Sequence, residues 1–89
     1  RILEKYYSIL RDDKKDKVAR GSVARGLREI LDARSIDVIM DVLKTEKSKW
    51  VQSYSVEALG YLIDEYKIGQ WEKETIIDLL FNIIYQDLF

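Results

Sequence analysis

The sequence predicts an all-α protein built from about five helices that stack as successive helical hairpins. Three observations lead to this fold class. Apolar residues recur at the three- and four-residue spacing of amphipathic helices along the 89-residue chain, and the alternating pattern of strands is absent. Short charged stretches separate the apolar segments. The helices also form pairs that repeat after about 32 residues, which is typical of helical arrays.

The first hairpin is expected to contain two helices, at about 1–11 and 17–31, separated by the charged sequence DDKKD at 12–16. The first helix carries an apolar stripe at helical spacing, made of Ile2, Leu3, Tyr6, Tyr7, Ile9 and Leu10. The second helix has a corresponding stripe of Ala19, Val23, Leu27 and Ile30. Because each stripe covers one side only, we expect the two helices to bury these sides.

The second hairpin is expected at about 33–45 and 49–66. Asp32 and Ser48 stand where side-chain oxygens commonly cap a helix, and Ser35 falls in the first turn of the third helix. The stripe of the fourth helix comprises Val51, Ser55, Ala58, Leu59, Leu62 and Tyr66. Glycine inside a helix costs up to about 1 kcal/mol. The glycines of the second and fourth helices therefore indicate close packing or room for a ligand; they are Gly21, Gly26 and Gly60.

A fifth helix is expected at about 71–88, after Gly69 ends the fourth, and Glu72 and Glu74 suit the positive end of its dipole. Its apolar residues surround much of its circumference, although the last helix of an array should have a polar outer face. We therefore expect a contact with a further repeat, or with another copy of the chain, through Ile77, Phe81, Ile84 and Leu88. Because residue 1 is arginine rather than methionine, we expect a piece of a longer protein.

The composition excludes several classes of function. The chain has no histidine, the commonest general base and transition-metal ligand, and no cysteine for disulfides or thiolate chemistry. Neither a phosphate-binding glycine loop nor a metal-ligand spacing is found. The longest apolar run, IIDLLFNIIY, is too short to span a bilayer. We therefore expect a cytoplasmic protein that is not an enzyme and that holds no metal or cofactor.

Charge is distributed unevenly along the chain. Residues 1–34 contain ten Lys/Arg and six Asp/Glu, whereas residues 35–89 contain five and ten. Such asymmetry can steer a partner or align copies head to tail. Near the first turn the basic residues form a cluster of Arg11, Lys14, Lys15, Lys17 and Arg20. This cluster makes weak nucleic-acid binding an alternative function, although three aspartates are interleaved with it.

The two hairpins can be aligned as copies of one another. A shift of 32 positions places Leu27 on Leu59, and a shift of 33 positions places Leu10 on Leu43. The two offsets differ by one residue, which a turn can absorb. Neither hairpin has enough apolar surface to fold alone, so the pattern indicates that each buries its stripe against the other.

The second hairpin resembles a known repeat. The segments DARSIDVIMDVL at 32–43 and WVQSYSVEALGYLID at 50–64 resemble a short HEAT repeat of the phycobilisome-lyase-like type. Asp32 and Arg34 match the family's turn, 58–60 match its Ala-Leu-Gly sequence, and Gln52 replaces the usual arginine. The resemblance implies a right-handed α–α superhelix, with repeats at about 1–32 and 33–66 and a partial repeat at 71–89.

In HEAT-like arrays the second helices line a concave surface that commonly binds a partner, so the resemblance implies a protein-interaction scaffold. The candidate contact residues on this surface are Arg25, Arg28, Glu29, Glu57, Tyr61 and Asp64. An ordinary solvated surface with an ion pair between Arg25 and Glu57 is the alternative interpretation of the same residues. A lyase-like accessory subunit that assists chromophore attachment is a further alternative function.

Overall fold

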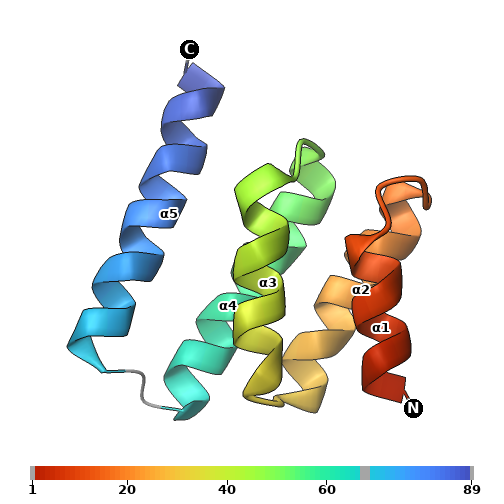
Figure 1. The fold of residues 1–89 in the computed structure, drawn as a ribbon, viewed down its shortest axis with the longest axis horizontal. Coiled ribbons are helices and arrows are strands. Elements are labelled where there is room, and N and C mark those ends of the chain that lie inside the picture. The colour runs from red at the N-terminus through yellow and green to blue at the C-terminus, as the bar shows by residue number, and fades with distance from the viewer. Residues whose placement is uncertain (1, 67–68, 89) are drawn as a thin grey trace.

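The computed structural model describes residues 2–66 and 69–88, with the backbone alone for 70–72 and 83–88. These residues form five α-helices and no strand (Figure 1). The helices are α1 (Ile2–Arg11), α2 (Lys17–Ile30), α3 (Arg34–Thr45), α4 (Lys49–Tyr66) and α5 (Gln70–Leu88). The predicted all-α class is therefore confirmed, and each helix end lies within about one residue of its expected position.

The helices lie in two rows, one formed by α1, α3 and α5 and the other by α2 and α4 (Figure 1). We call the α1–α2 pair hairpin 1 and the α3–α4 pair hairpin 2. The most extensive helix–helix contact joins α2 to α4, while α3 packs against α1, α4 and α5. The resulting slab measures 33 × 31 × 15 Å, so it is about two helices thick. The two hairpins therefore bury apolar side chains against each other in one shared core.

The core lies between the two rows and within the contact between the hairpins. Its largest fully buried apolar side chains are Leu10, Leu27, Ile39, Leu43, Leu59, Leu62 and Val51. Leu27 and Leu59, which the 32-residue shift superimposes, are both at most 1 % exposed. Full burial of a side chain of this size contributes about 1.5–3 kcal/mol before the loss of conformational entropy. The expected burial of these two leucines is confirmed.

Four residues assigned to apolar stripes lie on the surface instead, the first of them Ile2 of α1, which is 69 % exposed. Ala19 is exposed and Ile30 is 40 % exposed, because they lie on the side of α2 opposite Gly21, which faces α4. Tyr66 is also partly exposed, in the last turn of α4, where its hydroxyl donates a hydrogen bond to the carbonyl of Leu31. The apolar residues of α2 cover enough of its circumference to contact a neighbouring helix on each side within its row. Among the described helices, only α4 packs against α2 within that row.

The turn between the hairpins is fixed by Leu31 and Asp32. Leu31 adopts the left-handed conformation with φ 55°, and its N–H donates to the carbonyl of Leu27, which closes α2. Asp32 accepts hydrogen bonds from the backbone N–H of Arg34 at 2.9 Å and from the guanidinium of Arg34 at 2.9 and 3.1 Å. The guanidinium first, and the backbone N–H second, lower the pKa of Asp32 to about 2.

The two predicted helix caps have different outcomes. Ala33 immediately precedes α3, one position after the predicted cap, and it makes no side-chain cap. The Asp32 carboxylate does accept a hydrogen bond from the backbone N–H of Arg34, the first residue of α3, so it supplies the expected capping interaction from one position further back. Ser48 does cap α4, because its Oγ accepts a hydrogen bond from the N–H of Val51 at 3.4 Å.

The three helix glycines have different surroundings. A Cβ atom at Gly21 would lie 2.4 Å from Cδ1 of Trp50, and one at Gly26 would lie 3.1 Å from Cε2 of Tyr6. A Cβ atom at Gly60 would meet nothing within 4 Å. Close packing therefore explains the first two glycines, whereas Gly60 leaves an open place on the surface of α4.

Candidate functional site

The outer surface of α2 and α4 brings together four of the six predicted contact residues. Arg28 of α2 donates a hydrogen bond from Nη1 to Oε1 of Glu57 on α4, at 2.7 Å. The guanidinium carbon of Arg28 also lies 5.1 Å from the centre of the Tyr61 ring. Oε1 of Glu29 lies 3.5 Å from Nε of Arg28. Arg28 therefore connects the two second helices at the predicted surface.

The expected ion pair between Arg25 and Glu57 is wrong, because Arg28 takes the place of Arg25. Gly21 contacts α4, and Arg28 lies seven residues later, on the same side of α2. Arg25 lies almost one turn earlier, and its side chain is exposed to solvent. Aligning equivalent residues therefore did not identify the residues in contact, since the packed helices are offset by about three positions.

A shallow depression on α4 includes the predicted residues Tyr61 and Asp64. It has a volume of about 300 Å³ and is lined by Val56, Glu57, Gly60, Tyr61 and Asp64. Gly60 leaves its floor open, because the space beside its Cα is empty. Tyr61 is 53 % exposed, so an aromatic ring and the Asp64 carboxylate stand beside an apolar floor. This arrangement suits the insertion of a side chain from another molecule.

The Arg28 contacts orient side chains more than they stabilise the fold. The Arg28 side chain is 20 % exposed and that of Glu57 is 44 % exposed, and such half-exposed pairs contribute about 0–1 kcal/mol. The contact of Arg28 with the Tyr61 ring adds about 0.5–1 kcal/mol. Together they restrict the Tyr61 ring and neutralise Glu57. Asp64 forms no ion pair with a described cation, in contrast to Glu57, so its carboxylate is the negative group of the depression that is available to a ligand.

A larger polar depression, of about 650 Å³, lies beside the turns at 12–16 and 46–48. Its lining includes four of the five basic residues considered for nucleic-acid binding, namely Arg11, Lys15, Lys17 and Arg20. However, Arg11 lies 3.6 Å from Asp41 and Arg20 is bound to Glu46, so both arginines already face carboxylates. The depression therefore has mixed charge, and its cations are only partly available to phosphate groups.

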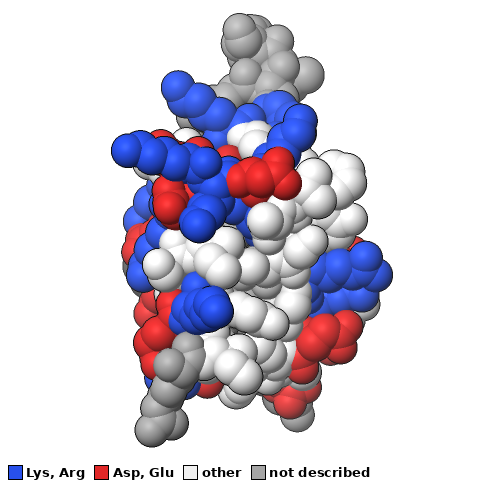
Figure 2. All heavy atoms as spheres, turned by 90° about the vertical axis from the view of Figure 1, so that its right-hand side faces the viewer, with Lys and Arg blue, Asp and Glu red and all other residues white. Residues whose placement is uncertain are grey.

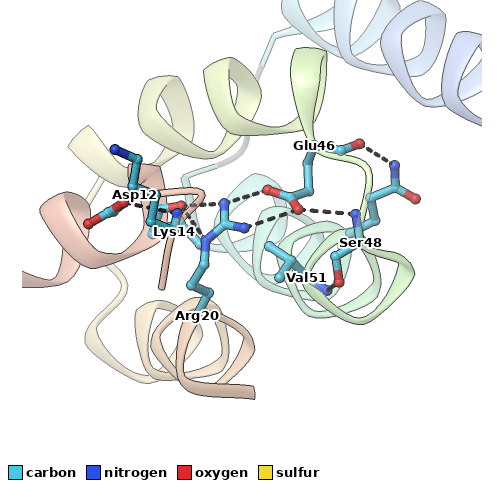
Figure 3. Close-up of polar contacts among 8 residues, drawn as sticks. Asp12, Lys14, Arg20, Glu46, Ser48 and Val51 are labelled. Atoms are coloured by element: carbon cyan, nitrogen blue, oxygen red, sulfur yellow. Dashed lines mark hydrogen bonds and ion pairs between the residues drawn. The ribbon is translucent and has the colours of Figure 1, made fainter. Parts of the chain in front are cut away.

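Arg20 forms a buried polar network that the sequence analysis did not predict (Figure 3). Its Nε and Nη2 donate to the carbonyl of Leu10 at 3.1 and 2.7 Å. Its Nη1 and Nη2 donate to the Glu46 carboxylate at 3.1 and 2.5 Å, and Glu46 also accepts from the N–H of Ser48. The side chains of Arg20 and Glu46 are only 6 % and 7 % exposed. This network therefore joins the two hairpins and does not offer a binding site.

The position of Gln52 is the signal that could have revealed this network. Gln52 follows Arg20 by 32 residues, and its Nε2 donates to the carbonyl of Glu46 at 2.7 Å. Arg20 and Gln52 each extend from the first turn of the second helix of their hairpin. Each donates a hydrogen bond to a carbonyl at the end of the first helix of that hairpin. A buried polar residue at the same place in both hairpins indicates a structural role for that place.

The exposed side of α5 includes two of the four residues predicted to contact a further helix or another chain. Ile77 and Phe81 are each 56 % exposed, whereas Ile76 is buried in the core. The side chains of Ile84 and Leu88 lie outside the described part of the chain. What covers this side of α5 stays a prediction.

The described residues lack two other kinds of functional feature, a metal site and a membrane-spanning helix. No group of three or more His, Cys, Asp and Glu side chains there could hold a metal ion. No helix among those residues combines the length and the apolar character needed to cross a membrane. Comparison with protein-family models, with curated proteins and with solved structures gave no match to this chain.

Proposed function

We propose that the chain is a protein-interaction module with the architecture of a HEAT-like right-handed solenoid fragment. The support for this architecture is the arrangement of two helical hairpins side by side, with Leu10 and Leu43, and Leu27 and Leu59, buried at equivalent positions. Arrays of this kind bind partners along the surface formed by successive equivalent helices. The repeats at 1–32 and 33–66 and the partial repeat at 71–89 are part of the same proposal.

The observation that carries the binding function is the open depression at Gly60 beside the exposed ring of Tyr61. A glycine within a helix costs about 0.5–1 kcal/mol relative to alanine. No neighbouring atom requires glycine at this place, in contrast to Gly21. A bound side chain would fill the open place and bury the tyrosine, a residue type that often dominates binding energy.

The chemistry of the depression indicates the kind of segment that binds. Val56 and Gly60 favour an apolar side chain, and the ring of Tyr61 extends the apolar surface. Asp64 favours a lysine or arginine a short distance along the segment. The proposed ligand is therefore a protein segment with one apolar anchor and a neighbouring basic residue.

Site-specific photo-crosslinking tests this proposal. Ser53 is exposed and lies seven residues before Gly60, on the same side of α4, so a photoreactive residue there would contact the bound segment. In extract of the source cells, we expect a defined crosslinked product that Gly60→Trp abolishes by filling the depression. Asp37 is exposed on α3 and provides the control position. Equal products from both positions, or products unaffected by Gly60→Trp, would contradict the proposal.

A pair of charge reversals provides an independent test. Arg28→Glu should reduce the crosslinking yield, because it removes the contact that orients Tyr61 and places two carboxylates together. Arg25→Glu makes the same change of charge on the same helix, but at a side chain without an ion pair among the described residues. A larger loss from Arg25→Glu than from Arg28→Glu would assign binding to a different part of α2.

A further inference from the structure

Hairpin 1 has an apolar end face on the side away from hairpin 2. We define this end face by five residues of α1 and α2, namely Ile2, Tyr6, Ala19, Gly26 and Ile30. Ile2 is 69 % exposed and Ile30 is 40 % exposed. Figure 2 views this end of the molecule, and a broad uncharged band runs along it, with charged side chains gathered at its upper end and along its edges.

The equivalent positions in hairpin 2 are completely buried. The shifts of 33 and 32 residues relate the five end-face residues to Ser35, Ile39, Val51, Ala58 and Leu62, and each of these is 0 % exposed. Hairpin 1 covers this side of hairpin 2, because α2 packs along α4 and the hydroxyl of Tyr7 is hydrogen-bonded to Oγ of Ser35 at 2.8 Å. The same pattern of positions is thus covered by a helical hairpin in hairpin 2, whereas in hairpin 1 it is exposed or half-exposed.

The contact between the hairpins also indicates which polar groups an occupant of the end face needs. Across that contact Arg28 pairs with Glu57, and Arg20 pairs with Glu46. The residues equivalent to these two glutamates on the end face are Arg25 and Asp13, and both are exposed. A matching hairpin would therefore place a carboxylate opposite Arg25 and a cation opposite Asp13.

We propose that the end face of hairpin 1 binds a helical hairpin of a partner protein, seated as hairpin 1 is seated on hairpin 2. A second copy of this chain does not meet the requirement. Its hairpin 2 carries Gln52 and Gly60 at the positions of Arg20 and Arg28, so it supplies neither the cation nor the carboxylate. In addition, α5 already packs against α3. This face is separate from the depression at Gly60, so the proposal stands independently of the binding function proposed for α4.

The absence of natural cysteine allows a direct test. Ala19 is exposed, so the rate of thiol modification of an Ala19→Cys variant reports whether the end face is covered. The probe for the partner is a fusion in which an extra copy of residues 1–33, carrying Arg28→Glu, precedes Arg1 and so preserves the spacing of the hairpins. We expect this fusion to slow modification at least about ten-fold, because reaction then requires local opening. Lys44→Cys, exposed on α3, should react equally with and without the added hairpin.

Equal modification rates for the Ala19→Cys variant with and without the added hairpin would overturn the proposal. Thiol modification of the unfused Ala19→Cys variant that becomes slower as the protein concentration rises would also overturn the proposal, because a second copy of the chain would then cover the end face. A fusion that retains arginine at position 28 of the added hairpin isolates the charge requirement, since it sets two arginines opposite each other. That fusion should protect the thiol less, and equal protection by the two fusions would refute the pairing with Arg25.

Discussion

Truncation of Glu46 should destabilise the protein strongly, because it leaves the buried guanidinium of Arg20 without its counter-charge. The two side chains are 6 % and 7 % exposed and share hydrogen bonds of 2.5 and 3.1 Å. Removing one member of such a buried pair costs about 3–5 kcal/mol. A domain of this size has a total stability of roughly 4–13 kcal/mol. At about 4–8 °C per kcal/mol, Glu46→Ala should lower the Tm by roughly 12–40 °C.

A double-mutant cycle separates the charge interaction from side-chain packing. Arg20→Met alone leaves the Glu46 carboxylate buried with the Ser48 N–H as its hydrogen-bond donor, so it should also cost about 3–5 kcal/mol. The combination of Arg20→Met and Glu46→Met removes both charges. It leaves the Leu10 carbonyl and the Ser48 N–H without these partners, at about 1–3 kcal/mol each. At the middle of these ranges the two single variants together lose about 8 kcal/mol and the double variant about 4 kcal/mol, so the cycle should give a coupling energy of about 4 kcal/mol.

Urea unfolding followed by far-UV circular dichroism at pH 7 and low temperature would supply the free energies of unfolding. Asp41→Ala provides the control, because Arg11 and Asp41 are 3.6 Å apart with side chains 51 % and 60 % exposed. This surface pair should contribute less than about 1 kcal/mol. Losses below about 1 kcal/mol for Arg20→Met and Glu46→Met, or losses that simply add in the double variant, would refute the argument that the pair is shielded from water.

Further predictions concern the glycines and the turn between the hairpins. Gly60→Ala should raise the free energy of unfolding by about 0.5–1 kcal/mol, and with it the urea midpoint, because the added Cβ atom meets no atom within 4 Å. Gly21→Ala should lower the midpoint, since its Cβ would lie 2.4 Å from Trp50; shifts of the same sign would contradict the packing described. The pKa of Asp32 is lowered to about 2, chiefly by Arg34, so its stabilising effect is present above the unfolded pKa near 3.9 and is lost as the pH falls towards 2. Asp32→Asn should therefore reduce the loss of stability between about pH 4 and 2, and an unchanged pH profile would argue against this linkage.

The sequence predicted the helices well, because helical spacing and turn residues are local properties. The stripe containing Leu27 and Leu59 identified core residues, since both hairpins use that side in the same way. Ala19 and Ile30 show the limit of this approach. Their pattern indicates a buried side, but burial depends on whether a neighbouring helix is present, and periodicity carries no information about that neighbour.

The contacts between helices were less predictable than the helices themselves. Four residues of the predicted surface lie close together, yet Arg28 rather than Arg25 meets Glu57, because the axial offset of packed helices depends on side-chain volumes at their crossing. The network around Arg20 was missed for a related reason. A charged residue in the first turn of a helix resembles a solvated one in sequence, and only the surrounding helices make it buried.

The contact of Trp50 with Gly21 gives the molecule an intrinsic fluorescent reporter of the association between its hairpins. The indole of Trp50 belongs to hairpin 2 and lies against the backbone of hairpin 1, with the ring of Tyr54 5.4 Å away. In a Trp71→Phe background, its emission would change when the hairpins separate, even while the helices stay wound. Comparison of emission with circular dichroism along one urea titration would then show whether undocking precedes helix melting or coincides with it.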